Sequence, residues 1–63
     1  MSTLNELAEQ ISRLYPVEDT RKGIRYRIVD QLAGTTELEA IGGESRYVAT
    51  HALEDQSLWR LSA

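Results

Sequence analysis

Apolar residues recur every three to four positions near the N-terminus, which is the spacing of one face of a helix. This apolar stripe comprises Leu4, Leu7, Ala8, Ile11, Leu14 and Tyr15. Thr3 followed by Glu6 matches a capping box, in which each side chain satisfies a backbone N–H group of the other residue. Pro16 disfavours helical geometry in the residue before it. The pattern therefore predicts a helix over residues 4–14.

The apolar positions change to strict alternation after a polar connector at residues 17–23. Ile24, Tyr26 and Ile28 alternate with two arginines, and a period of two residues is typical of a half-buried strand. We therefore expect a strand over residues 24–30.

Two adjacent glycines, Gly42 and Gly43, predict a tight hairpin turn between strands at residues 36–41 and 44–52. A two-residue turn would pair Leu38 with Tyr47, Glu39 with Arg46 and Ala40 with Ser45. The core-facing side of this hairpin would comprise Leu38, Ala40, Tyr47 and Ala49. The opposite side would be charged, and would comprise Glu37, Glu39, Glu44 and Arg46. A shift of one residue on one strand would move its side chains to the other side.

The last segment has two interpretations. In the favoured one, the strand continues through a core-facing, partly buried His51, a turn follows at residues 54–56, and a closing strand spans residues 57–62 with Trp59 directed inward. The alternative is a second helix over residues 50–61, because several residues there have little preference for strands.

Together these elements predict an α+β fold, with an N-terminal α-helix packed on a small antiparallel sheet of three to four strands. The αββββ order fits an open meander covered by the helix, or a sheet curled into an SH3-like or Sm-like barrel. The 63 residues are sufficient for one domain, residues 1–63, whose core would be thin.

The residues that catalysis or metal binding require are scarce. The chain contains no cysteine and only one histidine, so neither a disulfide nor a usual zinc site can form. No nucleophile motif accompanies His51, and Gly42-Gly43 lacks the lysine of a phosphate-binding loop. We therefore expect no enzyme activity, no cofactor and no metal. The absence of cysteine and of a long apolar segment fits a cytoplasmic protein.

Charge is distributed unevenly in a chain whose net charge is −3. Four of the seven positive charges form a basic cluster, which comprises Arg21, Lys22, Arg25 and Arg27. The predicted hairpin carries the acidic counterpart, at Glu37, Glu39 and Glu44 beside Arg46. A surface with separated charges orients a protein on its partner. These eight residues are therefore the candidates for partner binding.

By elimination, the sequence favours a small non-catalytic protein-interaction module, a regulator or inhibitor that binds a larger protein or complex. For so short a regulator, we expect that a phage or a plasmid encodes the chain. The alternative is a small nucleic-acid-binding barrel that uses the basic cluster from Arg21 to Arg27. The overall acidity disfavours this alternative. A homodimer would compensate for the thin core of so short a chain. No membrane association is expected.

Overall fold

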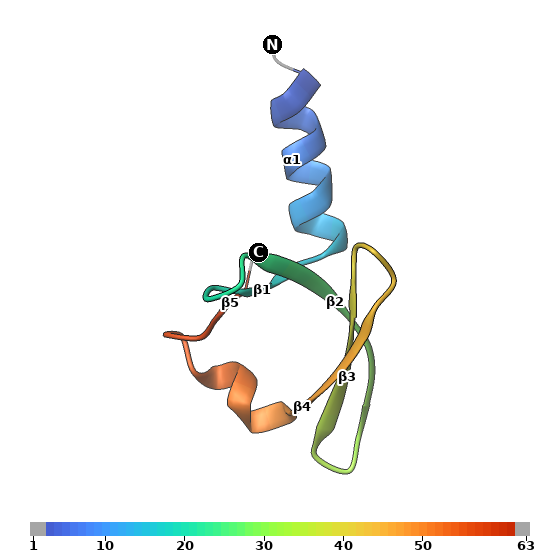
Figure 1. The fold of residues 1–63 in the computed structure, drawn as a ribbon, viewed down its shortest axis with the longest axis vertical. Helices are drawn as coiled ribbons and strands as arrows, with labels where there is room; N and C mark the ends of the chain where they lie inside the picture. The colour runs from blue at the N-terminus through green and yellow to red at the C-terminus, as the bar shows by residue number, and fades with distance from the viewer. Residues whose placement is uncertain (1–2, 62–63) are drawn as a thin grey trace.

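The computed structural model describes residues 3–61, and their side chains from residue 5 onward. The predicted capping contact of Thr3 lies outside the described side chains. One helix precedes five antiparallel strands, and a short 3₁₀-helix, η1, connects the last two strands (Figure 1). In chain order the elements are α1 (Thr3–Leu14), β1 (Val17–Asp19), β2 (Ile24–Leu32), β3 (Thr35–Ala40), β4 (Ser45–Ala49), η1 (Thr50–Glu54) and β5 (Trp59–Leu61). The predicted α+β class is confirmed.

The five strands form one open sheet in the order β4-β3-β2-β1-β5. The sheet curls, so that β4 and β5 approach each other as its two edges, with η1 between them (Figure 1). A β-bulge between Ile28 and Asp30 on the long strand β2 contributes to the curl, because bulges bend a strand and increase its twist. The sheet does not close into an SH3-like or Sm-like barrel, because β4 and β5 are its two edges and do not pair with each other.

The segment after β4 differs from both sequence interpretations. Residues 50–54 form η1 instead of continuing the predicted strand 44–52, and no long helix spans residues 50–61. His51 lies on η1 and is exposed, so the expectation of a partly buried strand histidine is wrong. The turn after η1 is held by Asp55, whose Oδ1 accepts hydrogen bonds from the backbone N–H and the hydroxyl group of Ser57. This turn leads directly into β5.

The core occupies the concave side of the curled sheet. Its buried apolar residues are Val17, Tyr26, Leu38, Ala40 and Trp59, with Val48, Leu53 and Leu58 packed against them. Val17 belongs to β1, a strand that the sequence pattern presented as a polar connector. β1 lies between β2 and β5 in the sheet, and it alternates two buried side chains with a half-buried glutamate. Three residues are too few for this alternation to be recognised in the sequence.

α1 meets the sheet at its C-terminal end and extends away from it (Figure 1). The predicted helix bounds, 4–14, agree closely with the observed ones. Its apolar stripe is largely in solvent, however, since Leu7 is half-exposed and Leu14 is 65% exposed. The core is therefore built by the sheet and η1, without a covering helix.

The turn between β2 and β3 contains the single residue other than glycine that has a positive φ in the described part of the chain. Ala33 has a φ of 53° and Gly34 a φ of 80°, and the flanking residues Leu32 and Thr35 are paired across the strands. Two consecutive residues with positive φ are typical of the type I′ turn, for which Asn-Gly is a preferred sequence. An alanine in this conformation is strained by a close approach of its Cβ atom to the backbone.

Replacing Ala33 with asparagine is therefore expected to stabilise the fold by roughly 0.5–1 kcal/mol, because asparagine tolerates the left-handed conformation better than alanine. Thermal unfolding followed by circular dichroism should show a melting temperature about 2–8 °C higher. Thr35→Asn is the matched control, since it introduces the same side chain at a neighbouring exposed strand position and should not raise the melting temperature.

Candidate functional site

The hairpin of β3 and β4 is shifted by one residue from the predicted register. Leu38 lies opposite Arg46 and Glu37 lies opposite Tyr47, whereas the sequence prediction paired Leu38 with Tyr47. The cause is a turn of three residues instead of two. The N–H of Gly43 donates to the carbonyl of Ala40 at 2.8 Å, and Gly43 has a φ of 92°. A glycine in this role is typical of three-residue hairpins with a bulge.

The shift moves every side chain of β4 to the opposite side of the sheet from the predicted one. Arg46 and Val48 now point to the concave side, where they are half-buried. Tyr47 and Ala49, predicted to face the core, are on the outer side, and Tyr47 is 67% exposed. The register therefore places a charged residue inside and a large aromatic residue outside, which reverses the usual preference.

Arg46 crosses the concave side from the edge strand β4 to the carboxylate of Asp19 on β1. Its Nη1 donates to Asp19 Oδ2 at 2.8 Å and to the hydroxyl group of Tyr26 at 3.2 Å. Its guanidinium carbon lies 5.0 Å from the ring centre of Trp59 and 5.7 Å from that of Tyr26, within the range of cation–π attraction. These contacts connect β4 to β1, β2 and β5, so Arg46 stabilises the curled shape of the sheet.

The carboxylate of Asp19 is 1% exposed and is satisfied on both oxygens. Oδ2 accepts from Arg46, and Oδ1 accepts from the backbone N–H groups of Arg21 and Lys22 at 3.0 and 3.2 Å. The hydrogen bond from Arg46 lowers the pKa of Asp19 and the backbone hydrogen bonds act in the same direction, against the opposing effect of burial. Asp19 is therefore a charged structural residue of the core, which the sequence analysis did not identify.

The predicted basic and acidic surfaces are not separate, because a cross-strand pair joins Arg27 to Glu39. Arg27 lies opposite Glu39, and its Nη2 is 2.6 Å from the carboxylate. Arg25 lies opposite Glu18, with Nη1 at 3.6 Å from a carboxylate oxygen, and its Nε donates to the carbonyl of Tyr15 at 2.9 Å. Two of the four residues of the basic cluster are thus engaged within the molecule.

The remaining predicted residues lie in different places. Arg21 and Lys22 are exposed in the turn after β1. Glu44 is exposed at the end of the β3–β4 turn, and Glu37 is half-buried beside Tyr47 on the outer side. The structure therefore keeps Glu37 and Glu39 on the outer side of the hairpin, whereas Glu44, opposite Ala40, moves to the concave side with Arg46.

The outer side of the hairpin is the candidate partner-binding surface. We call it the hairpin surface and define it by Glu37, Glu39 and Tyr47. Tyr47 lies directly across from Glu37, and Glu39 is two residues farther along the same side of β3. An exposed tyrosine surrounded by carboxylates offers an anchor with an apolar ring and a polar tip. The sequence analysis did not identify Tyr47 as a binding candidate, because it assumed a two-residue turn at Gly42-Gly43. The same sequence also fits a three-residue turn that ends at Gly43.

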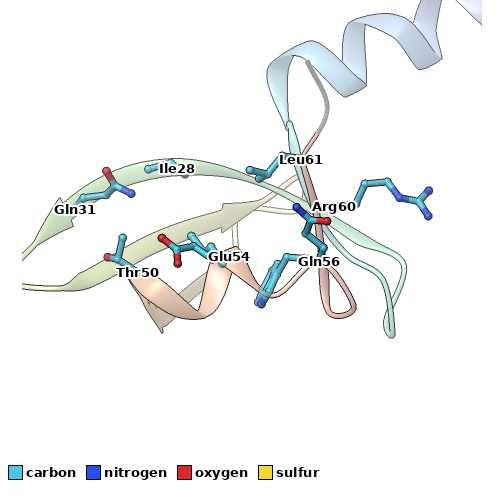
Figure 2. A pocket seen from close by; sticks show the side chains of 9 residues that line it. Ile28, Gln31, Thr50, Glu54, Gln56, Arg60 and Leu61 are labelled. Carbon is cyan, nitrogen blue, oxygen red and sulfur yellow. The ribbon is translucent and has the colours of Figure 1, made fainter.

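A second surface feature is an open groove of about 740 Å³ between β2 on one wall and η1 and β5 on the other (Figure 2). Ile28, Leu53, Trp59 and Leu61 supply its apolar lining. The polar lining comprises Gln31, Thr50, Glu54, Gln56 and Arg60, although the guanidinium of Arg60 points away from the groove. We call this feature the groove.

Among the described residues, no three acidic, histidine or cysteine side chains lie close enough together to hold a metal ion. The described helices include none that is long and apolar enough to cross a membrane. Comparison of the chain with protein-family models, curated proteins and solved structures found no significant match.

Proposed function

We propose that the chain is a small non-catalytic interaction module that binds a larger partner protein through the hairpin surface. The observation that carries this proposal is the register of β4, which exposes Tyr47 and buries part of Arg46. Tyrosine is among the residues that contribute most to protein–protein affinity when a partner covers them. Tyr47 is exposed on the outer side, while its neighbour Arg46 faces the concave side, so the Tyr47 ring is available to contact a partner protein.

The chemistry of the hairpin surface indicates the chemistry of the partner. Its two carboxylates are offset by one arginine, Arg27, which leaves a net negative charge around the Tyr47 ring. A partner surface with an apolar pocket and lysine or arginine residues at its rim would be complementary to it. β4 is also an edge of the sheet, so the partner can reach its backbone as well as its side chains. A bound module of this kind would act as a regulator or inhibitor by covering the partner's surface.

Nucleic-acid binding has weaker support. It would require Arg25 and Arg27 to reach phosphates, but both are engaged with carboxylates and a backbone carbonyl. The net charge of −3 also opposes association with a polyanion. Of the basic cluster, Arg21 and Lys22 are exposed in the turn after β1.

The test is a site-specific photo-crosslink. Tyr47 is replaced by a photoreactive phenylalanine analogue, the protein is expressed in its source cells, and the adducts are identified by mass spectrometry. We expect one dominant protein adduct. The same analogue at Leu14, which is 65% exposed on α1 and outside the sheet, is the matched control and should not produce this adduct.

The identified partner is then titrated with purified variants. Tyr47→Ala is expected to weaken binding by about 30-fold or more, as loss of an anchor residue does. Glu37→Lys should also weaken binding of the partner, and its effect should be largest at low salt. Identical adducts from positions 47 and 14, or unchanged affinity of Tyr47→Ala, would contradict the proposal. Binding of labelled oligonucleotides at about 50 mM salt that is lost in Arg21→Glu would favour the nucleic-acid alternative instead.

A further inference from the structure

The two edge strands of the sheet differ in how well they are protected against pairing with another chain. β5 has only three residues, and its Arg60 is exposed. Short edge strands and exposed charged side chains both hinder the addition of a further strand. β4 has five residues, contains no proline and carries no charged side chain on the outer side. The charge of Arg46 on its concave side is already balanced by Asp19 at 2.8 Å. β4 is therefore the open edge of this sheet.

The hairpin ladder identifies which backbone groups of β4 face this edge. The N–H of Ala40 donates to the carbonyl of Glu44, and the N–H of Thr50 donates to the carbonyl of Gly34, both at 2.8 Å. Because an antiparallel ladder alternates hydrogen-bonded with non-hydrogen-bonded pairs, the even-numbered residues of β4 bond to β3 and the odd-numbered ones face away from it. The residues that present both N–H and carbonyl groups at the free edge are Ser45, Tyr47 and Ala49.

The outer side next to β4 carries unbalanced negative charge. Asp30 on β2 lies directly opposite Glu37 on β3, and Glu37 lies opposite Tyr47, so these residues form one row that ends at the free edge. Like charges directly opposite each other destabilise a sheet. Among the described residues, no ion pair includes Asp30 or Glu37. A cationic side chain brought to this edge would reduce the repulsion between the two carboxylates.

We propose that an extended basic segment of the partner protein adds to the sheet as an antiparallel strand beside β4. This inference rests on the proposed function, and it specifies how the partner reaches the hairpin surface. Each of the three edge-facing residues would exchange two hydrogen bonds with the residue opposite it, so the segment would make about six backbone hydrogen bonds. Backbone pairing of this kind supplies affinity, and every second side chain supplies specificity.

The register determines the side chains that the segment needs. The residue opposite Tyr47 lies with it on the outer side, where a β-branched or aromatic side chain packs against the ring. The residues opposite Ser45 and Ala49 are each two positions away, on the same side. Because serine and alanine are small, a lysine or arginine at these positions can extend over β4 toward Glu37. The expected segment therefore has a β-branched or aromatic residue with a basic residue two positions before it and another two positions after it.

A second copy of this chain fits the edge less well. Its own β4 has no basic side chain on the outer side, and pairing of two β4 strands would bring two negatively charged rows toward each other. Five residues of strand also bury less surface than the roughly 1,200 Å² of a stable specific interface. A basic segment gains the charge attraction that a second copy lacks, and a larger partner supplies further contact area around Tyr47.

A synthetic peptide, Gly-Ser-Lys-Val-Ile-Thr-Lys-Ser-Gly with both ends blocked, is the probe. Its isoleucine is placed opposite Tyr47, and its lysines opposite Ala49 and Ser45. Because the contact is small, we expect a dissociation constant of about 0.1–1 mM at low salt. With peptide at about ten times this constant, hydrogen exchange followed by NMR should slow about 10-fold at the three edge-facing amides. The amides of Arg46 and Val48 already bond to β3 and should change little.

Two altered peptides separate the backbone from the charge. N-methylation of the isoleucine removes its backbone donor and keeps its side chain, and it should weaken binding at least about 10-fold. Replacement of both lysines with glutamate should also weaken binding at least about 10-fold at low salt, with a smaller difference at high salt. No binding of the unmodified peptide, equal binding of the N-methylated peptide, or equal slowing at odd and even residues of β4 would overturn the strand addition.

Ala49→Pro tests the edge in the protein itself. Ala49 has a φ of −63°, which proline adopts, and its N–H faces away from β3. Proline is tolerated at such a position of an edge strand, so the melting temperature should stay within about 2 °C of the wild type. The variant loses one donor at the free edge and should bind the peptide at least about 10-fold more weakly. Ala49→Ser keeps the N–H and is the matched control.

The partner captured through position 47 is titrated with the same two variants. A loss of affinity of at least about 10-fold in Ala49→Pro, with no loss in Ala49→Ser, supports the strand addition. Unchanged affinity of Ala49→Pro together with weakened binding by Tyr47→Ala would overturn the strand addition and leave the proposed function intact. Binding of the peptide at the edge without any captured partner would count against the proposed function instead.

Discussion

Replacing Arg46 with methionine is expected to destabilise the fold by about 2–4 kcal/mol, because it leaves the buried carboxylate of Asp19 without its charged partner. The substitution also removes the cation–π contacts with Tyr26 and Trp59. A domain of this size has a total stability of only about 3–5 kcal/mol. Urea unfolding followed by tryptophan fluorescence should therefore show a large part of the variant unfolded before denaturant is added.

The matched control is Arg27→Met, which makes the same chemical change at an exposed ion pair. Arg27 lies 2.6 Å from Glu39 on the outer side of the sheet, and exposed pairs contribute about 0–1 kcal/mol. The double variant Asp19→Asn with Arg46→Met should recover part of the lost stability, because it removes the buried charge as well as its partner. Equal losses from Arg46→Met and Arg27→Met would contradict the role given to Arg46.

The same ion pair has a consequence for stability in acid. The pKa of Asp19 in the folded state lies below its ordinary value, mainly because of the hydrogen bond from Arg46. A lowered pKa means that the contribution of Asp19 to stability is present above the unfolded pKa, about 3.9, and is lost as the pH falls through the folded pKa. Asp55 also has a lowered pKa, because it accepts hydrogen bonds from Ser57, so the comparison must be made with Asp19→Asn. The stability difference between wild type and Asp19→Asn should be constant from pH 7 to about 5 and should shrink below about pH 4.

The helix and the two long strands could be predicted because each spans several periods of its pattern. Ile24 to Ile28 alternate over enough positions to fix a strand, and the stripe of α1 extends over three turns. The position of α1 could not be predicted in the same way. An amphipathic pattern shows that a helix needs a cover, but it does not show which surface provides it.

The candidate site was predicted only in part, and the reason is the length of one turn. The sequence Ile41-Gly42-Gly43-Glu44 fits a hairpin turn of either two or three residues, and the choice decides which side of the sheet holds each residue of β4. The acidic residues Glu37 and Glu39 were placed correctly on the outer side because they belong to β3. Arg46 and Tyr47 each lie on the side of the sheet opposite to the predicted one. The polarity of the side chains favoured the wrong register, because Asp19, the residue that makes an inward arginine stable, lies on a strand too short to be recognised.

The register also predicts opposite results for two tyrosines. Tyr26→Ala is expected to destabilise the fold by about 3–5 kcal/mol, because Tyr26 is buried against Trp59 and its hydroxyl group accepts a hydrogen bond from Arg46. Tyr47→Ala should change stability by less than about 0.5 kcal/mol, since its ring lies in solvent. Urea unfolding of both variants measures this contrast under identical conditions. In the two-residue-turn register Tyr47 would be a core residue, and both substitutions would be costly. A small effect of Tyr47→Ala therefore establishes that the ring is free to bind a partner, and any loss of binding in that variant can then be assigned to the lost contact and not to unfolding.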